Sequence, residues 1–186
     1  MKIRLAADLQ SDSIVDGEGI RTVLWTQGCP HHCFGCHNSE TWDFEDGALI
    51  ELDEIKEKFK SLKAQDGITF SGGDPMCQAE ACAELAKYAK SLGLNIWCYT
   101  GYTYEQLMIL SKSNKHIMDF LKQIDVLVDG KFILAEKSYD AIFRGSKNQR
   151  IIDVKKSLDK NKVCLVKKYI IKTKEEKSTF KEYLFV

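Results

Sequence analysis

Three cysteines within eight positions constrain this chain more than any other feature of its sequence. The segment TQGCPHHCFGCHN, residues 26–38, contains Cys29, Cys33 and Cys36 together with three of the four histidines. The spacing is Cys-x3-Cys-x2-Cys, directly after a short apolar run that reads as a strand. Thiolate is the soft ligand that iron–sulfur and zinc chemistry selects. The segment is therefore the first candidate for a functional site.

The spacing alone leaves three interpretations open. A structural zinc ion normally takes four protein ligands, and His31, His32 or His37 would be its nearby fourth ligand. A cubane iron–sulfur cluster suits three thiols on one loop better, because three cysteines hold three irons and leave the fourth iron open to a substrate. Unpaired cysteines also occur as small buried hydrophobes, so three unrelated structural residues are the remaining alternative.

Composition narrows the class of protein. With 186 residues, of which 44% are hydrophobic, the chain is expected to form a single domain over residues 1–186 around one core. Lys plus Arg and Asp plus Glu both number 27, which argues against a nucleic-acid or membrane-surface partner. We find no signal-peptide or membrane-spanning pattern and expect a cytoplasmic protein. Thiols or metal ligands are then expected rather than disulfides.

Short apolar runs alternate with helical patterns along most of the chain, which is typical of parallel β-α units. The predicted strands span residues 21–27, 67–72, 95–100 and 125–130. The predicted helices span residues 52–63, 78–93, 103–111 and 115–124, the second ending at Gly93. Beyond Arg150, the runs 149–158 and 162–171 flank a turn-like DKNK and predict a hairpin or two short helices, and residues 173–186 are predicted helical.

The segment SGGDP, residues 71–75, follows the second predicted strand. Gly72 and Gly73 lack a Cβ atom, so a ligand can approach the backbone closely there. Parallel sheets also bind ligands beyond the carboxyl ends of their strands. A plainer interpretation holds at the same time: Asp74 caps the following helix and Pro75 occupies its first position.

Several motifs together resemble the radical S-adenosylmethionine family. The loop CPHHCFGC resembles the signature whose three cysteines bind a [4Fe-4S] cluster, and TFSGGDPM, residues 69–76, is similar to the family's glycine-rich segment. DGEGIRTVLWTQGC, residues 16–29, resembles the branch that activates glycyl-radical enzymes. Within that branch, NIWCYTGYTYEQL, IDVLVDGKF and FRGSKNQR resemble the activating proteins of anaerobic ribonucleoside-triphosphate reductases. The similarity covers roughly residues 14–152, and residues 153–186 form an extension of uncertain role.

The resemblance implies a fold and a site. The expected fold is α/β, a single-domain partial (β/α) barrel of mostly parallel strands with an open side. Cys29, Cys33 and Cys36 would hold the [4Fe-4S] cluster. The residues expected to line S-adenosyl-L-methionine are Gly35, Cys36, His37, Asn38, Gly72, Gly73, Asp74, Asp129 and Lys131. Much of the family has Glu where this chain has Asp74. Two of the assignments have alternatives: Asn38 could instead cap a helix, and Asp129 and Lys131 could lie at a solvated strand end.

The resemblance also implies an activity. One electron cleaves S-adenosylmethionine at the cluster, and the resulting 5′-deoxyadenosyl radical takes a hydrogen from a glycine of the large catalytic subunit of the anaerobic ribonucleotide reductase. A low-potential donor such as flavodoxin or ferredoxin would supply the electron. Two alternatives stay open: activation of another glycyl-radical enzyme such as pyruvate formate-lyase, and a non-catalytic zinc or iron–sulfur module.

Other polar and aromatic residues allow weaker predictions. Arg144 and Arg150 are expected either to contact the partner or to lie in a solvated loop. The three tryptophans are expected to pack in the core or in loops. The remaining cysteines, Cys77, Cys82, Cys98 and Cys164, are too far apart in the sequence to predict a second cluster.

Overall fold

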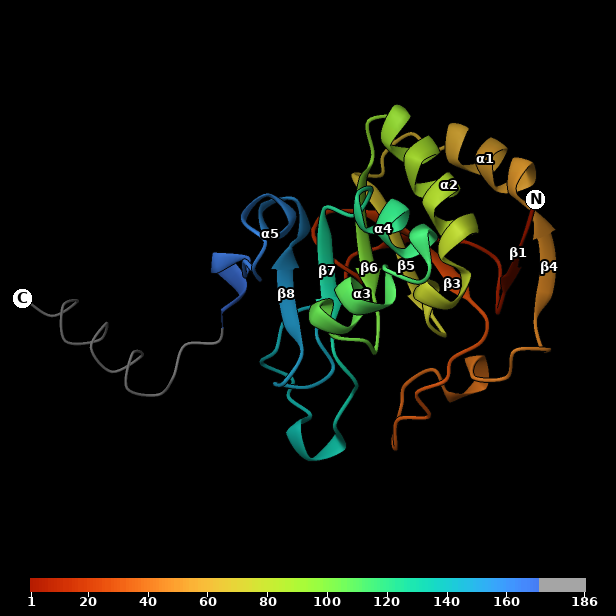
Figure 1. Cartoon of the computed structure of the whole chain (residues 1–186). Helices are drawn as coiled ribbons and strands as arrows, with labels where there is room; N and C mark the ends of the chain where they lie inside the picture. Colours follow the sequence, from red (N-terminus) through yellow and green to blue (C-terminus); the bar gives the residue numbers. More distant parts are fainter. Residues whose placement is uncertain (171–186) are drawn as a thin grey trace, which may run out of the picture.

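The computed structural model describes residues 1–170, which form a mixed eight-stranded sheet with helices packed against it (Figure 1). The strands are β1 (Lys2–Leu5), β2 (Gln10–Ser13), β3 (Arg21–Thr26), β4 (Ala48–Glu51), β5 (Gly67–Gly72), β6 (Asn95–Tyr99), β7 (Val126–Asp129) and β8 (Arg150–Asp153). Their order across the sheet is β4-β1-β3-β5-β6-β7-β8, and β2 pairs with β3 off this path.

The centre of the sheet is parallel, as the sequence predicts. Strands β3, β5, β6 and β7 pair in parallel, with Leu24 opposite Phe70 and Phe70 opposite Cys98. The outer strands β1, β2, β4 and β8 all pair antiparallel, which the sequence did not indicate. The hydrogen-bonded path is open, with β4 and β8 at its two ends. The mixed α/β sheet is thus confirmed, whereas the partial barrel is not.

Four of the helices match predicted segments with shorter ends. The helices are α1 (Leu52–Lys60), α2 (Ala79–Ser91), α3 (Tyr104–Leu110), α4 (Lys115–Leu121) and α5 (Val154–Lys160). Short 3-10 turns are η1 (Ser39–Thr41), η2 (Pro75–Gln78), η3 (Leu134–Glu136) and η4 (Lys167–Tyr169). Helix α2 contacts α1 and α4, and also β5 and β6 beneath it (Figure 1).

The chain after Arg150 differs from its prediction. It forms strand β8 and helix α5, and then an isolated antiparallel bridge from Leu165 back to Ile152, so the two runs meet as in a hairpin but with α5 between them. Ile151 and Ile152 are both buried, so this segment gains more by completing the sheet beside β7 than by forming a surface helix. Asp153 then ends the strand and caps α5 by accepting a hydrogen bond from the N–H of Lys156. The predicted helix over residues 173–186 lies outside the described residues.

The core lies between the sheet and helices α1, α2 and α4. It includes Phe70 and Phe120, whose rings meet edge to face at 5.2 Å. The four parallel strands end at Thr26, Gly72, Tyr99 and Asp129, so the loops that follow them gather at one edge of the sheet. Within residues 1–170, no helix is long and apolar enough to cross a membrane.

Candidate active site

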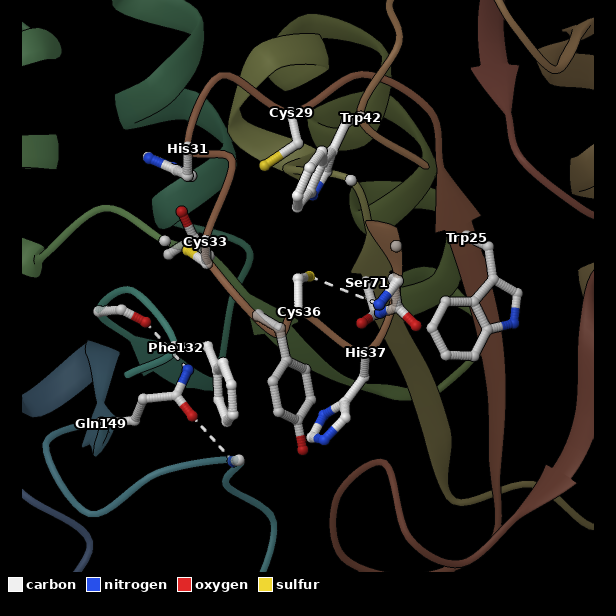
Figure 2. A pocket seen from close by; sticks show the side chains of 18 of the residues that line it. Trp25, Cys29, His31, Cys33, Cys36, His37, Trp42, Ser71, Phe132 and Gln149 are labelled. Carbon is white, nitrogen blue, oxygen red and sulfur yellow. Dashed lines mark hydrogen bonds between the residues drawn. The ribbon is translucent and has the colours of Figure 1, made fainter. Parts of the chain in front are cut away.

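A cavity lies at the edge where the parallel strands end, and the three cysteines of the sequence motif share its wall (Figure 2). The loop after β3 contributes the thiols, and the ends of β5, β6 and β7 contribute the other sides. The wall consists of Asp16, Trp25, Cys29, His31, Cys33, Cys36, His37, Asn38, Trp42, Ser71, Gly72, Gly73, Tyr99, Thr100, Gly101, Gly130, Phe132, Gly145 and Gln149.

Backbone hydrogen bonds hold the start of the cysteine loop. The N–H of Gly28 donates to the carbonyl of Thr41 at 2.9 Å, and the N–H of Cys29 donates to the carbonyl of Trp42 at 3.0 Å. Gly28 has a φ of +95°, and a Cβ atom there would lie 2.5 Å from the ring of Phe44. Further along, the N–H of Cys36 donates to the carbonyl of Cys33 at 3.0 Å. The loop is therefore fixed by its neighbours rather than by regular secondary structure.

Two of the three thiols, those of Cys29 and Cys33, lie in an environment that disfavours the free thiolate. Cys29 is buried, and this burial raises the pKa of its thiol to about 11, against a smaller lowering by the backbone N–H of His31. Burial also raises the pKa of Cys33. The Sγ atom of Cys36 accepts a hydrogen bond from the N–H of Asn38 at 3.4 Å. Such thiols ionise when a positively charged metal centre binds them, and N–H donors to sulfur are typical of iron–sulfur sites.

The three thiols do not converge on one point. In the part of the chain that the structure describes, no three His, Cys, Asp or Glu side chains converge closely enough to hold one metal ion. Three thiols spread over one cavity wall are compatible with a larger inorganic core that each of them binds at a separate metal atom.

Gly72 and Gly73 lie on the cavity wall, but the chain's own backbone explains why they are glycines. A Cβ atom on Gly73 would lie 2.4 Å from the carbonyl oxygen of Gly28 and 2.9 Å from that of Thr41. Gly72 has a φ of +98°, and its Cβ atom would lie 2.5 Å from the carbonyl oxygen of Thr26. The sequence predicted that a ligand would approach these glycines closely. In the structure, backbone at the end of β3 and in the cysteine loop already makes that close approach.

Asp74 lies behind the wall. Its side chain is fully buried and accepts the N–H of Met76 at 3.0 Å, as the predicted helix cap, with Pro75 in the first turn of η2. The same carboxylate also binds His31, Thr100 and the N–H of Gly101. Among these partners, His31 belongs to the cysteine loop and lines the cavity.

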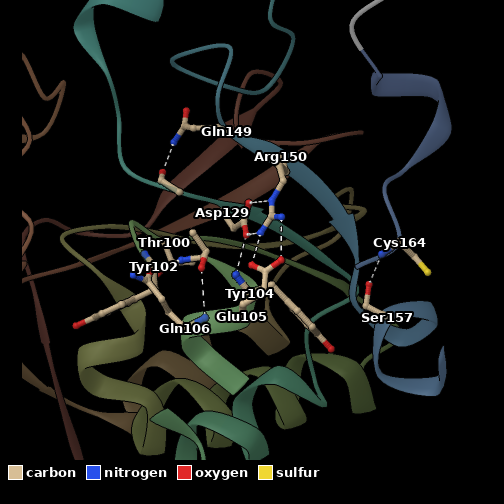
Figure 3. Close-up of polar contacts among 12 residues, drawn as sticks. Thr100, Tyr102, Tyr104, Glu105, Gln106, Asp129, Gln149, Arg150, Ser157 and Cys164 are labelled. Atoms are coloured by element: carbon tan, nitrogen blue, oxygen red, sulfur yellow. Dashed lines mark hydrogen bonds and ion pairs between the residues drawn. The ribbon is translucent and has the colours of Figure 1, made fainter. Parts of the chain in front are cut away.

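Asp129 and Lys131 do not line the cavity. The buried Asp129 carboxylate accepts two hydrogen bonds from Arg150, at 3.0 and 2.5 Å, and one from the N–H of Tyr104 at 2.7 Å (Figure 3). Arg150 also forms two bonds to Glu105, at 3.0 and 2.7 Å. These hydrogen bonds raise the pKa of Arg150 and lower that of Glu105 to about 2. Arg150 therefore ties α3, β7 and β8 together, and Lys131 is exposed.

The remaining predicted residues lie in the cysteine loop. His37 and Asn38 line the cavity, and the His37 ring lies 5.1 Å from that of Phe132. Asn38 occupies the N-cap position of η1 without a side-chain cap bond. Gly35 has a φ of +75° and packs beside Leu134, outside the wall.

Some wall residues escaped prediction. Trp97 is buried as expected, but Trp25 and Trp42 line the cavity. Gln149 joins two loops, because its Nε2 donates to the carbonyl of Gly130 at 2.9 Å while its Oε1 accepts the N–H of Gly145 at 2.8 Å (Figure 2). Trp25 could have been predicted as a wall residue, because it lies next to the end of a predicted strand. Gln149 lies in the FRGSKNQR motif, but the sequence assigned it no role.

The side chain of Arg144, expected to contact the partner or lie in a solvated loop, is partly buried. It donates to the carbonyl of Tyr169 at 2.7 Å, and burial lowers its pKa.

Comparison with known proteins agrees with the cysteine motif. Residues 15–152 match the family model described as a 4Fe-4S single cluster domain. The anaerobic ribonucleoside-triphosphate reductase-activating protein of Enterobacteria phage T4 is 35% identical over 74% of this chain and 86% of its own length. Those of Haemophilus influenzae and Escherichia coli K12 are 35% and 34% identical, over 74% and 73% of this chain and 90% of their own.

The chain belongs to this family of reductase-activating proteins. The similarity inferred from the motifs is confirmed, and it covers almost the same residues. Among solved structures, QueE from Escherichia coli overlaps 55% of this chain and 54% of its own at 14% identity, with a TM-score of 0.45. The assignment of the family rests on the curated relatives and the family model.

Proposed function

We propose that this chain activates an anaerobic ribonucleoside-triphosphate reductase by generating a glycyl radical on the reductase's large catalytic subunit. The observation that carries the proposal is the placement of three thiols from one loop on a single cavity wall. In this proposal, Cys29, Cys33 and Cys36 hold a [4Fe-4S] cluster. The names of the curated relatives support the choice of the reductase as the target.

The cofactors supply the radical chemistry. A [4Fe-4S] cluster held by Cys29, Cys33 and Cys36 would supply the one-electron reduction of S-adenosylmethionine, which would give methionine and, after hydrogen transfer from Cα of the reductase glycine, 5′-deoxyadenosine and the glycyl radical. A one-electron donor such as flavodoxin or ferredoxin would return the cluster to its reduced state.

In this proposal, the chain's own residues bind S-adenosylmethionine and shield the reacting atoms from water. The cavity edge offers backbone at Gly72 and Gly73, and side chains at His37 and Asn38, to the methionine and adenosine parts of the cofactor. Together with Cys36 on the wall and Gly35 just outside it, these are the residues we propose for S-adenosylmethionine. Trp25, Trp42 and Phe132 add apolar surface that keeps water from a reactive radical.

Two alternatives predict different results. An activator of pyruvate formate-lyase would generate the radical on that enzyme, while the named relatives favour the reductase. A non-catalytic module would bind metal without cleaving S-adenosylmethionine.

The test is anaerobic reconstitution with iron and sulfide, followed by mixing with the large reductase subunit, S-adenosylmethionine and a reductant. Electron paramagnetic resonance should then show a glycyl radical, and chromatography should show 5′-deoxyadenosine. The Cys33→Ala variant should give neither product, whereas Cys82→Ala, on the buried face of α2, should give both. Pyruvate formate-lyase in place of the reductase tests the first alternative. Iron-loaded protein that leaves S-adenosylmethionine intact would contradict the proposal.

A further inference from the structure

The acceptor capacity of the Asp74 carboxylate is filled by the protein itself. Its Oδ1 accepts the N–H of Met76 and the hydroxyl of Thr100, both at 3.0 Å. Its Oδ2 accepts from His31 Nε2 at 2.7 Å, from the N–H of Gly101 at 3.0 Å and from the same Thr100 hydroxyl at 2.9 Å. A carboxylate has about four lone-pair sites, so no site remains for the ammonium group or hydroxyls of a cofactor.

These donors come from different parts of the sheet edge. Met76 belongs to η2 after β5, Thr100 and Gly101 follow β6, and His31 lies between Cys29 and Cys33. Helix capping needs only the bond to Met76. The remaining bonds connect the cysteine loop to the ends of two parallel strands, which capping does not require.

The His31 ring is enclosed as tightly as the carboxylate. Its side chain is only 7% exposed, and its ring meets that of Tyr102 edge to face at 4.4 Å. A Cβ atom on Gly101 would lie 2.3 Å from the imidazole, so position 101 leaves no room for a side chain beside His31. Nε2 lies 2.7 Å from the Asp74 carboxylate oxygen, and it is the donor in this bond when the carboxylate is ionised.

We propose that Asp74 and His31 form a positioning pair that locks the cysteine loop, and that Asp74 acts on the cluster through His31 rather than by binding S-adenosylmethionine. The proposal rests on the proposed function for the identity of the cluster. A partner that orients a loop of metal ligands is expected to affect how long the metal centre stays bound, as outer-shell partners of metal ligands do. This role for Asp74 differs from the one that the family resemblance implied, in which Asp74 lines S-adenosylmethionine.

The test compares variants at both positions in reconstituted protein without the reductase. His31→Leu removes the donor and keeps apolar bulk, while His31→Gln keeps a nitrogen donor close to the position of Nε2. The first readout is the rate at which a chelator removes iron from the cluster, and the second is the Kd for S-adenosylmethionine on protein with full iron content. His32→Asn is the matched control, because His32 lies on the same loop, packs on Trp42 at 4.9 Å and has a φ of +47° that asparagine tolerates.

We expect His31→Leu and Asp74→Asn each to speed iron loss about tenfold. The double variant should be no faster than Asp74→Asn alone, because the bond that His31→Leu removes is one of those that Asp74→Asn weakens. His31→Gln and His32→Asn should stay close to the starting protein, and cofactor affinity should change little in all five variants. The electron paramagnetic resonance spectrum of the reduced cluster should broaden in His31→Leu and Asp74→Asn but not in His31→Gln.

Two results would overturn the proposal. A large loss of cofactor affinity in Asp74→Asn with normal iron retention would make Asp74 a direct ligand. Additive effects of the two variants on iron loss would show that the residues do not act as a pair. Because iron loss is measured without the reductase, a failure of the pair is distinguishable from a failure of glycyl-radical formation. Thermal unfolding of each variant separates loop release from global unfolding.

Discussion

The backbone N–H of Asp74 donates a hydrogen bond to the carbonyl oxygen of Gly28 at 2.9 Å, which joins the glycine-rich segment directly to the cysteine loop. The next residue back, Gly73, donates to the carbonyl of Thr26 at 2.7 Å. The two motifs that the sequence presents as separate are thus one hydrogen-bonded unit. A change in either is expected to disturb both.

Gly73→Ala tests this unit. Because the new Cβ atom would lie 2.4 Å from the carbonyl oxygen of Gly28, the cysteine loop must shift, and we expect a loss of about 1–3 kcal/mol in unfolding free energy. Iron retention should fall together with stability. Chemical denaturation and iron analysis of the reconstituted protein measure the two effects.

Gly93→Ala is the control for Gly73→Ala. Gly93 has a φ of +83° but no atom within 4 Å of a Cβ position, so alanine there adds only backbone strain of about 1 kcal/mol. Iron retention should be unchanged. Normal iron content in Gly73→Ala, with weaker binding of S-adenosylmethionine alone, would instead mean that the cofactor makes the close approach at this glycine.

The cysteines provide a second prediction. Replacing Cys29, Cys33 or Cys36 by Ala should reduce iron content to background and abolish cleavage of S-adenosylmethionine, since each removes a thiol from the cavity wall. Cys77→Ala should retain both properties, because Cys77 is exposed and lies outside the wall. Parallel iron analysis and 5′-deoxyadenosine assays compare the four variants. Full activity in any of the first three would refute the cluster assignment.

Local patterns were sufficient to predict the parallel centre of the fold. Each of its strands is a short apolar run before a turn, and the helices between them repeat their apolar residues at helical spacing. The antiparallel strands were missed because β1, β2 and β4 have four residues each and gain stability only from partners distant in the sequence. Strand β8 was missed for the same reason.

The site was predictable only in part. The thiols share one loop, so their spacing along the chain is enough to identify them as a group. The bonds that hold Asp74 and Asp129 come from residues distant in the chain, such as Thr100 for Asp74 and Arg150 for Asp129. Sequence position placed both acids at strand ends but gave no sign that internal donors occupy them.

Arg150 is expected to be important for stability. Arg150→Met would leave the Asp129 carboxylate, 1% exposed, without its cationic partner, and the expected loss is about 3–5 kcal/mol of unfolding free energy. Adding Asp129→Asn should restore part of this loss, because the unpaired charge is then removed. Urea unfolding of the single and double variants measures both. A stable Arg150→Met protein with impaired reductase binding would make Arg150 a partner contact, as the sequence allowed.

The ion pair between Arg150 and Glu105 predicts that stability depends on pH. Arg150 lowers the pKa of Glu105 from 4.5 to about 2, so the contribution of Glu105 to stability is present above about pH 4.5 and is lost as the pH falls toward 2. Because Glu105 is 56% exposed, we expect Glu105→Gln to cost no more than about 1 kcal/mol at neutral pH. The difference in unfolding free energy between the two proteins should shrink between pH 4.5 and pH 2. A difference that stays constant over this range would show that charge is not its source.

The exposed edge of the cysteine loop predicts where the reductase docks. Phe34 lies between Cys33 and Cys36 and is 83% exposed, and the loop next to it presents Ile133 and Leu134, each more than 40% exposed. Large apolar side chains beside a cavity mouth are typical of a protein contact. In the proposed function a reductase glycine must come close to the cavity to react, so docking is expected to cover this edge.

Phe34→Ser should therefore lower the yield of glycyl radical and weaken binding to the reductase subunit, while cleavage of S-adenosylmethionine without the reductase continues. Leu92→Ser is the control, since Leu92 is 41% exposed but precedes β6 and lies toward the opposite ends of the parallel strands. Paired measurements of complex formation, radical yield and 5′-deoxyadenosine separate docking from chemistry. Equal loss of all three in Phe34→Ser would mean that Phe34 supports the cluster loop, and full radical yield would place the docking surface elsewhere.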